Sequence, residues 1–105
     1  MKPAGLGETE LRLMTAVFRR HPEIAAVKLF GSRAMGTFRP QSDVDLAVWG
    51  SVGPLGAESI AGELDELALP LRFEVQAFEH IGHRELREHI ERVGVPIYSK
   101  FSDEP

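Results

Sequence analysis

The stretch FGSRAMGTFRPQSDVDL, at residues 30–46, joins two apolar runs and decides how the chain folds. Gly31-Ser32 ends the first run, and ten residues later Asp43-Val44-Asp45 opens the second. Backbone N–H groups and a hydroxyl after a glycine suit phosphate oxygens. Two carboxylates at strand spacing suit Mg²⁺. The stretch therefore predicts a phosphate cradle that faces a divalent-metal site.

The two apolar runs are predicted to be neighbouring strands. Residues 24–30 (IAAVKLF) are short, apolar and partly β-branched, and residues 43–49 (DVDLAVW) follow a loop over 37–42 that contains Pro40. The connection is too short for a crossover helix, so we expect an antiparallel pair.

Apolar spacing in the rest of the chain predicts three longer helices and two more strands. We expect one domain over residues 1–105, with loose tails at 1–7 and 101–105. The expected elements are a helix from Thr9 to His21, a loop over 50–56, a helix carrying Ile60, Leu64 and Leu67 that stops before Pro70, a strand at 71–78, a helix at 84–93 and an edge strand at 95–98.

Asp43 and Asp45 form the candidate metal site. Side chains two apart on a strand project from the same face, with α-carbons about 6.5 to 7 Å apart. A solvent-facing acidic edge, or a loop capped by Asp43, is the more common explanation of an isolated Asp-x-Asp. The apolar residues around the pair, Val44 and residues 46–49, indicate a buried strand instead. Buried carboxylates need a cation or strong hydrogen bonds.

Gly31, Ser32 and Arg33 are the candidate phosphate ligands. We expect Ser32 to cap a short helix that runs through Met35 and ends at Gly36, with backbone N–H groups of residues 32–34 at its start. A plain strand-to-helix turn remains the alternative. No Lys-Ser/Thr follows the second glycine, so the segment is not a P-loop.

Glu74 is a candidate third carboxylate. In the alternating strand at 71–78 it shares a face with Arg72 and Gln76. Two-metal phosphoryl transfer uses such a group to bind the catalytic metal and orient the attacking hydroxyl, although the pattern alone favours a solvated outward residue. His80-x-x-His83 suggests zinc only superficially, and we interpret both as surface histidines.

Composition excludes several functions. The chain has 105 residues, a formal net charge of −4 and no cysteine, which rules out disulfides and thiolate chemistry. The acidic balance argues against nonspecific nucleic-acid binding and favours a nucleotide as ligand. The sequence contains neither a signal-peptide h-region nor an apolar run of roughly 18 residues. We expect a cytoplasmic protein with no membrane contact.

These motifs resemble the minimal nucleotidyltransferases of the DNA polymerase β superfamily. The resemblance rests on Gly31-Ser32, ten intervening residues and Asp43-x-Asp45, and on the third strand. It extends to the ending Leu86-x-x-His89-Ile90-x-Arg92-Val93-Gly94-x-x-x-Tyr98. It implies an α+β fold, with a small mixed β-sheet flanked by helices.

The resemblance also implies roles for single residues. Gly31 and Ser32, with Arg33, would hold the nucleotide phosphates, and Asp43 and Asp45 would bind two Mg²⁺ ions, or Mn²⁺ in their place. Glu74 falls where the family usually has an aspartate as its third metal-binding and catalytic acid. The family often has an arginine where Met35 stands.

Minimal members of this family resemble antitoxins whose partner is an all-helical HEPN-domain protein. The implied activity is transfer of a nucleoside monophosphate from a nucleoside triphosphate, namely AMP from ATP, to an acceptor hydroxyl. The expected acceptor is a tyrosine of the HEPN toxin. A non-catalytic or nucleotide-binding module that neutralises its partner by complex formation is the alternative. The sequence leaves open whether the protein forms a homo- or hetero-oligomer.

Overall fold

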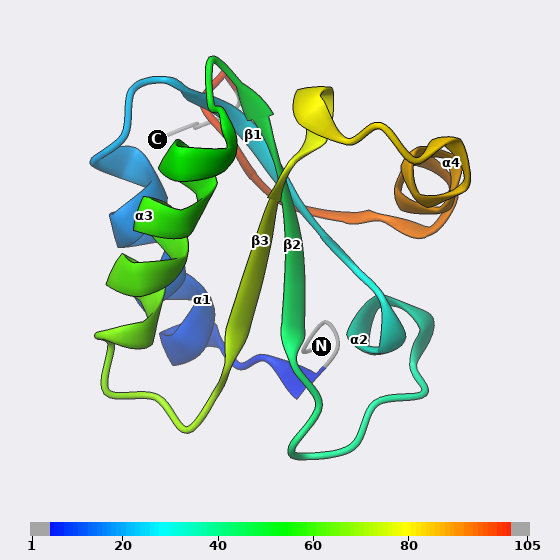
Figure 1. The fold of residues 1–105 in the computed structure, drawn as a ribbon. Helices are drawn as coiled ribbons and strands as arrows, with labels where there is room; N and C mark the ends of the chain where they lie inside the picture. The colour runs from blue at the N-terminus through cyan, green and yellow to red at the C-terminus, as the bar shows by residue number, and fades with distance from the viewer. Residues whose placement is uncertain (1–4, 102–105) are drawn as a thin grey trace.

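Residues 5–101, which the computed structural model describes, form one four-stranded mixed sheet with helices on both faces (Figure 1). The strands lie in the order β3-β2-β1-β4. The elements are α1 (Glu8–Arg19), β1 (Ile24–Phe30), α2 (Ser32–Met35), β2 (Val44–Gly50), α3 (Pro54–Asp65), β3 (Phe73–Ala77), the 3-10 helix η2 (Phe78–His80), α4 (Arg84–Val93) and β4 (Val95–Ser99).

Strand pairing brings distant parts of the sequence to one point. β1 and β2 are antiparallel, as expected, with Phe30 opposite Asp45. β2 and β3 are parallel, with Asp45 opposite Glu74, and α3 makes the crossover between them. β4 pairs antiparallel with β1 at the other edge. Asp45 therefore lies between the end of β1 and Glu74.

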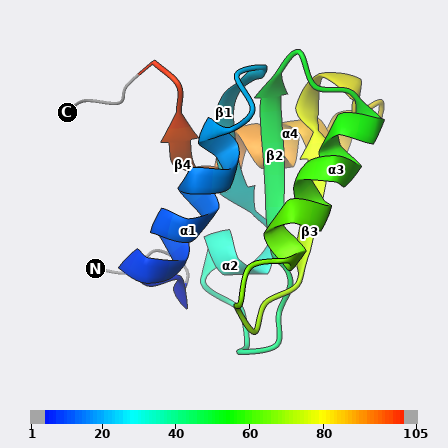
Figure 2. The ribbon, with the colours of Figure 1, turned by 90° about the vertical axis from the view of Figure 1, so that its left-hand side faces the viewer.

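One face of the sheet carries the main core. α1 and α3 cover this face, as Figures 1 and 2 show from two sides. Alternate residues of β2 point into it, because side chains of a strand alternate between faces. Burying these side chains supplies most of the stabilisation of a domain this small. The core includes Met14 and Phe18 of α1, Ile60 and Leu64 of α3, and Val44, Leu46 and Val48 of β2.

The opposite face is covered only in part. Ile90 of α4 packs with Phe30 and Ala47 in a second, smaller cluster. Trp49 stacks on Phe78 with ring centroids 4.3 Å apart. Asp45 and Glu74 alternate with core residues and so project from this face, where Glu74 is exposed. The predicted acids Asp45 and Glu74 therefore lie on the same face of the sheet as α4.

Three boundaries differ from the prediction. α3 begins at Pro54, inside the segment expected to be a loop, because proline is favoured in the first helical turn, where no N–H is needed. The third strand covers residues 73–77 rather than 71–78, and Phe78 starts η2. The expected tail at 1–7 is wrong at Leu6, which is buried in the core. Residues 1–4 and 102–105 lie outside the described residues.

Within residues 5–101, no helix has both the length and the apolar character that crossing a membrane requires.

A charged cluster joins the end of α1 to α3. His21 Nε2 lies 3.0 Å from Glu63 Oε2, and its Nδ1 lies 3.1 Å from Glu23 Oε2. Burial lowers the pKa of His21, but the hydrogen bonds and charges of Glu63 and Glu23 outweigh it and raise the pKa above the ordinary 6.5. The folded protein therefore holds this proton more tightly than the unfolded chain does.

We predict that the contribution of His21 to the free energy of unfolding falls as the pH rises above the ordinary histidine pKa of 6.5. The contribution of His21 is full below its unfolded pKa and is lost as the pH passes its raised folded pKa. Glu63→Gln should reduce this pH dependence, whereas Glu58→Gln, an exposed change on the same helix, should not. Urea unfolding over a pH series measures it, and an unchanged slope in Glu63→Gln would contradict the assignment.

Candidate active site

The turn after β1 lies directly against Asp45. A Cβ built on Gly31 would collide with Asp45 Oδ2, and Gly31 has a φ of 78°, which L side chains rarely adopt. Only glycine meets both conditions at this position. The predicted phosphate cradle and the predicted acid are therefore in contact through the backbone.

The surroundings of Asp45 raise the pKa of its carboxyl group. Burial raises its pKa from the ordinary value of 3.8 to about 6, with further contributions from the negative charges of Glu74 and Asp43. The negative charges of the other two predicted acids therefore both act on Asp45. A cation placed among them would reverse this effect, because it favours the ionised form.

Asp43 has a different neighbour. The first residue of β2, Val44, donates its N–H to the carbonyl of Arg72, the residue just before β3, at 2.8 Å. Arg72 Nε lies 3.8 Å from Asp43 Oδ1. Sequence reasoning missed this arginine, although its spacing of two from Glu74 already placed it on the same face.

Arg33 points away from solvent. Its side chain is buried, and its guanidinium donates to the Ser42 and Pro40 carbonyls and lies over the Phe38 ring. It thus holds the loop that leads from α2 to Asp43. Its role as a phosphate ligand stays a prediction, while these contacts give it a second role in positioning the loop.

The short helix α2 starts differently from the prediction. Gly31, not Ser32, is the N-cap residue, and no side chain caps the helix. Ser32 is instead the first helical residue, where helix geometry leaves the leading N–H groups without intrahelical acceptors. Gly36 ends the helix in the left-handed conformation, as expected.

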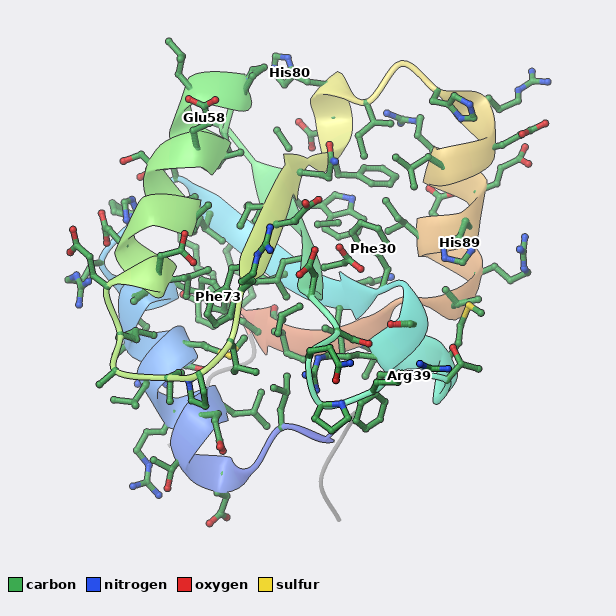
Figure 3. All side chains as sticks on the ribbon, turned by 60° about the horizontal axis from the view of Figure 1, so that its bottom comes forward. Phe30, Arg39, Glu58, Phe73, His80 and His89 are labelled. Carbon is green, nitrogen blue, oxygen red and sulfur yellow. The ribbon has the colours of Figure 1, made fainter. Side chains whose placement is uncertain are left out.

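A pair of rings connects the end of β1 with α4. Phe30 points from the end of β1 toward α4, where His89 lies (Figure 3). The two rings meet edge to face with centroids 6.3 Å apart. His83 caps α4, since its Nδ1 accepts the Leu86 N–H at 3.2 Å. This bond gives His83 a structural role. His80, on η2, is exposed.

The sequence pattern of the family described as "Polymerase beta, Nucleotidyltransferase" matches residues 14–103. The chain belongs to this family. The match includes Gly31, Asp43, Asp45 and Glu74, the residues that the strands bring together. The α+β nucleotidyltransferase fold predicted from the sequence is confirmed. None of the curated proteins compared with the sequence matches it.

Several solved structures with a similar fold are toxin–antitoxin complexes. One, a complex with AMP-PNP, superposes with a TM-score of 0.73 at 21% identity, covering 89% of this chain and 76% of that one. A second contains tri-AMPylated Shewanella oneidensis HEPN toxin with MNT antitoxin, with a TM-score of 0.68, 17% identity and coverages of 89% and 72%. A third is the MntA–HepT complex, with a TM-score of 0.68 at 16% identity, covering 90% of this chain and 74% of that one.

The acids of this nucleotidyltransferase suit Mg²⁺ by their chemistry. Carboxylate oxygens are its preferred protein ligands, and one or two carboxylates suffice when substrate phosphates complete the shell. Among residues 5–101, no three acidic or histidine side chains already converge as a metal site. The assignment of Asp43, Asp45 and Glu74 as metal ligands stays a prediction.

We predict that Gly31→Ala is more destabilising than Gly36→Ala. Both glycines have positive φ, 78° and 80°, but a Cβ at Gly36 meets nothing within 4 Å. Gly36→Ala should cost about 1 kcal/mol for its backbone conformation, and Gly31→Ala about 1 to 3 kcal/mol more for the collision. Chemical denaturation measures both. Combining Gly31→Ala with Asp45→Ala should recover part of the loss, and failure to do so would contradict the proposed contact.

We also predict that Asp45→Asn stabilises the metal-free protein at neutral pH. Because the folded pKa is raised, the contribution of Asp45 to stability declines as the pH rises from about 4 to about 6 and stays at its lowest above. The gain of Asp45→Asn should grow over this interval to about 1 kcal/mol, after allowance for solvent screening. Thermal unfolding with Asp65→Asn as control tests it, and a gain independent of pH would disprove it.

Proposed function

We propose that this protein is a cytoplasmic, Mg²⁺-dependent nucleotidyltransferase that moves AMP from ATP to a tyrosine hydroxyl of a HEPN-type partner. The observation that carries the proposal is the position of Asp45, which contacts the Gly31 turn on one side and faces Glu74 on the other. A phosphate cradle and paired carboxylates at one point suit phosphoryl chemistry.

The reaction is a single in-line displacement. The acceptor oxygen attacks the α-phosphorus of ATP and forms a new P–O bond, while the bond from this phosphorus to the bridging oxygen breaks and pyrophosphate leaves. The hydroxyl donates its hydrogen bond, and then its proton, to the Glu74 carboxylate. Glu74 is suited to this role because it is exposed and lies opposite Asp45.

The other residues bind and position the substrate. Ser32 and the N–H groups at the start of α2 hold phosphate oxygens. Asp43 and Asp45 hold two metal ions, and Arg33 keeps the loop before Asp43 in place. Bound Mg²⁺ supplies charge neutralisation at the α-phosphate and the leaving pyrophosphate.

The choice of acceptor is supported by the similar solved structures. One contains AMP-PNP, a nucleotide analogue, and another contains an AMPylated HEPN toxin with its antitoxin.

The proposal predicts labelling of a co-purified HEPN-domain partner by ATP labelled in its α-phosphate, in the presence of Mg²⁺. Asp43→Asn and Asp45→Asn should each lower the initial rate at least about 100-fold, because each removes a charge that holds metal at the reacting phosphate. Asp65→Asn, on the opposite face, should retain the wild-type rate. Mass spectrometry of the labelled partner should locate AMP on a tyrosine.

Two results would contradict this function. One is the absence of labelling by the wild-type protein, and the other is undiminished labelling by the Asp43→Asn/Asp45→Asn double variant. If that double variant loses transfer but still neutralises its partner as well as wild type, catalysis is dispensable. The protein would then act by complex formation.

A further inference from the structure

Arg72 and Glu74 place opposite charges along one edge of the site. Both residues project from the face that carries Asp43 and Asp45, because they are two apart along an extended segment. The parallel register sets Glu74 opposite Asp45, and just before the two strands begin Arg72 Nε lies 3.8 Å from Asp43 Oδ1. Each carboxylate of the Asp-x-Asp pair therefore has its own facing group. Asp45 faces a like charge, and Asp43 faces a cation.

The contact between Arg72 and Asp43 is weak by its geometry. The distance of 3.8 Å from Nε to Oδ1 is too long for a hydrogen bond. The Arg72 side chain is 83% exposed, so water screens the pair. A divalent cation, with twice the charge, can therefore displace the guanidinium from Asp43 at little cost.

Other cations near the sheet are held more firmly. Arg33 donates to the Ser42 and Pro40 carbonyls, and Arg87 donates to the Phe78 carbonyl at 2.9 Å and lies over its ring. Lys28 lies over the Trp49 ring, toward α4. Arg72 differs because its long, solvated side chain can leave Asp43 without breaking a backbone contact. Among these cations, Arg72 can therefore move most easily toward a charged ligand that binds at the site.

We propose that Arg72 is an exchangeable counter-ion of the site. It neutralises Asp43 in the empty protein, yields Asp43 to a divalent cation, and then binds the triphosphate through its released guanidinium. The inference rests on the metal and nucleotide site of the proposed function. Planar guanidinium groups suit phosphate oxygens, and a triphosphate that approaches three carboxylates needs added positive charge.

The first test uses Mn²⁺ alone, without nucleotide. Arg72→Gln removes the competing cation, so we expect Mn²⁺ to bind about two- to fivefold more tightly than to wild type, as measured by electron paramagnetic resonance of the free ion. Arg72→Lys keeps the charge and should bind Mn²⁺ like wild type. Arg12→Gln, an exposed change on α1 across the sheet, is the matched control for the loss of one positive charge.

The second test uses AMP-PNP at saturating Mg²⁺. We expect Arg72→Gln to bind this analogue at least about threefold more weakly by calorimetry, and Arg72→Lys to keep part of the affinity because it lacks only the planar fork. Opposite shifts for metal and nucleotide are the signature of exchange. A residue that merely supports the fold would weaken both.

The outcomes separate this inference from the function on which it rests. If Arg72→Gln binds Mn²⁺ no more tightly than wild type, or binds AMP-PNP equally well, the exchange proposal is overturned even when wild type transfers AMP. If wild type binds neither Mn²⁺ nor AMP-PNP, the proposed function itself fails. Neither measurement depends on transfer to a partner.

Discussion

The contact between the Gly31 backbone and the Asp45 carboxylate is the constraint on which the rest of the site depends. It requires a glycine with positive φ at the end of β1 and an antiparallel register that sets Phe30 opposite Asp45. Once this register is set, the leading N–H groups of α2 lie beside the acids. A shift by one residue would turn Asp45 into the apolar core.

The local parts of the site were predictable from the sequence. The Gly-Ser pair ends an apolar run, and the Asp-x-Asp pair lies inside another, so both strands and the segment between them follow from pattern alone. The antiparallel pairing followed as well, because the connection is too short for a crossover helix. What these predictions share is that each depends on residues close together in the chain.

The non-local parts were harder to predict. The parallel pairing of β2 with β3 decides that Glu74 faces Asp45, and no local pattern encodes this register. Burial of Arg33 depends on carbonyls seven and nine residues away, so its sequence suggested a phosphate ligand and gave no sign of its contacts with the loop. Arg72 was placed on the correct face, but its partner came from another strand. In contrast, the start of α3 at Pro54 had a local signal in the proline itself.

Asp43 and Asp45 have unequal electrostatic surroundings. Asp45 is costly to ionise in the empty protein, because burial, Glu74 and Asp43 all raise its pKa. Asp43 instead has the exposed Arg72 guanidinium nearby, with Nε 3.8 Å from Oδ1. A cation bound between them would gain most at Asp45, where it would relieve repulsion. Under the proposed function, binding of metal and nucleotide would recover the free energy that ionising Asp45 costs the folded protein, and would so couple the stability of this region to ligand binding.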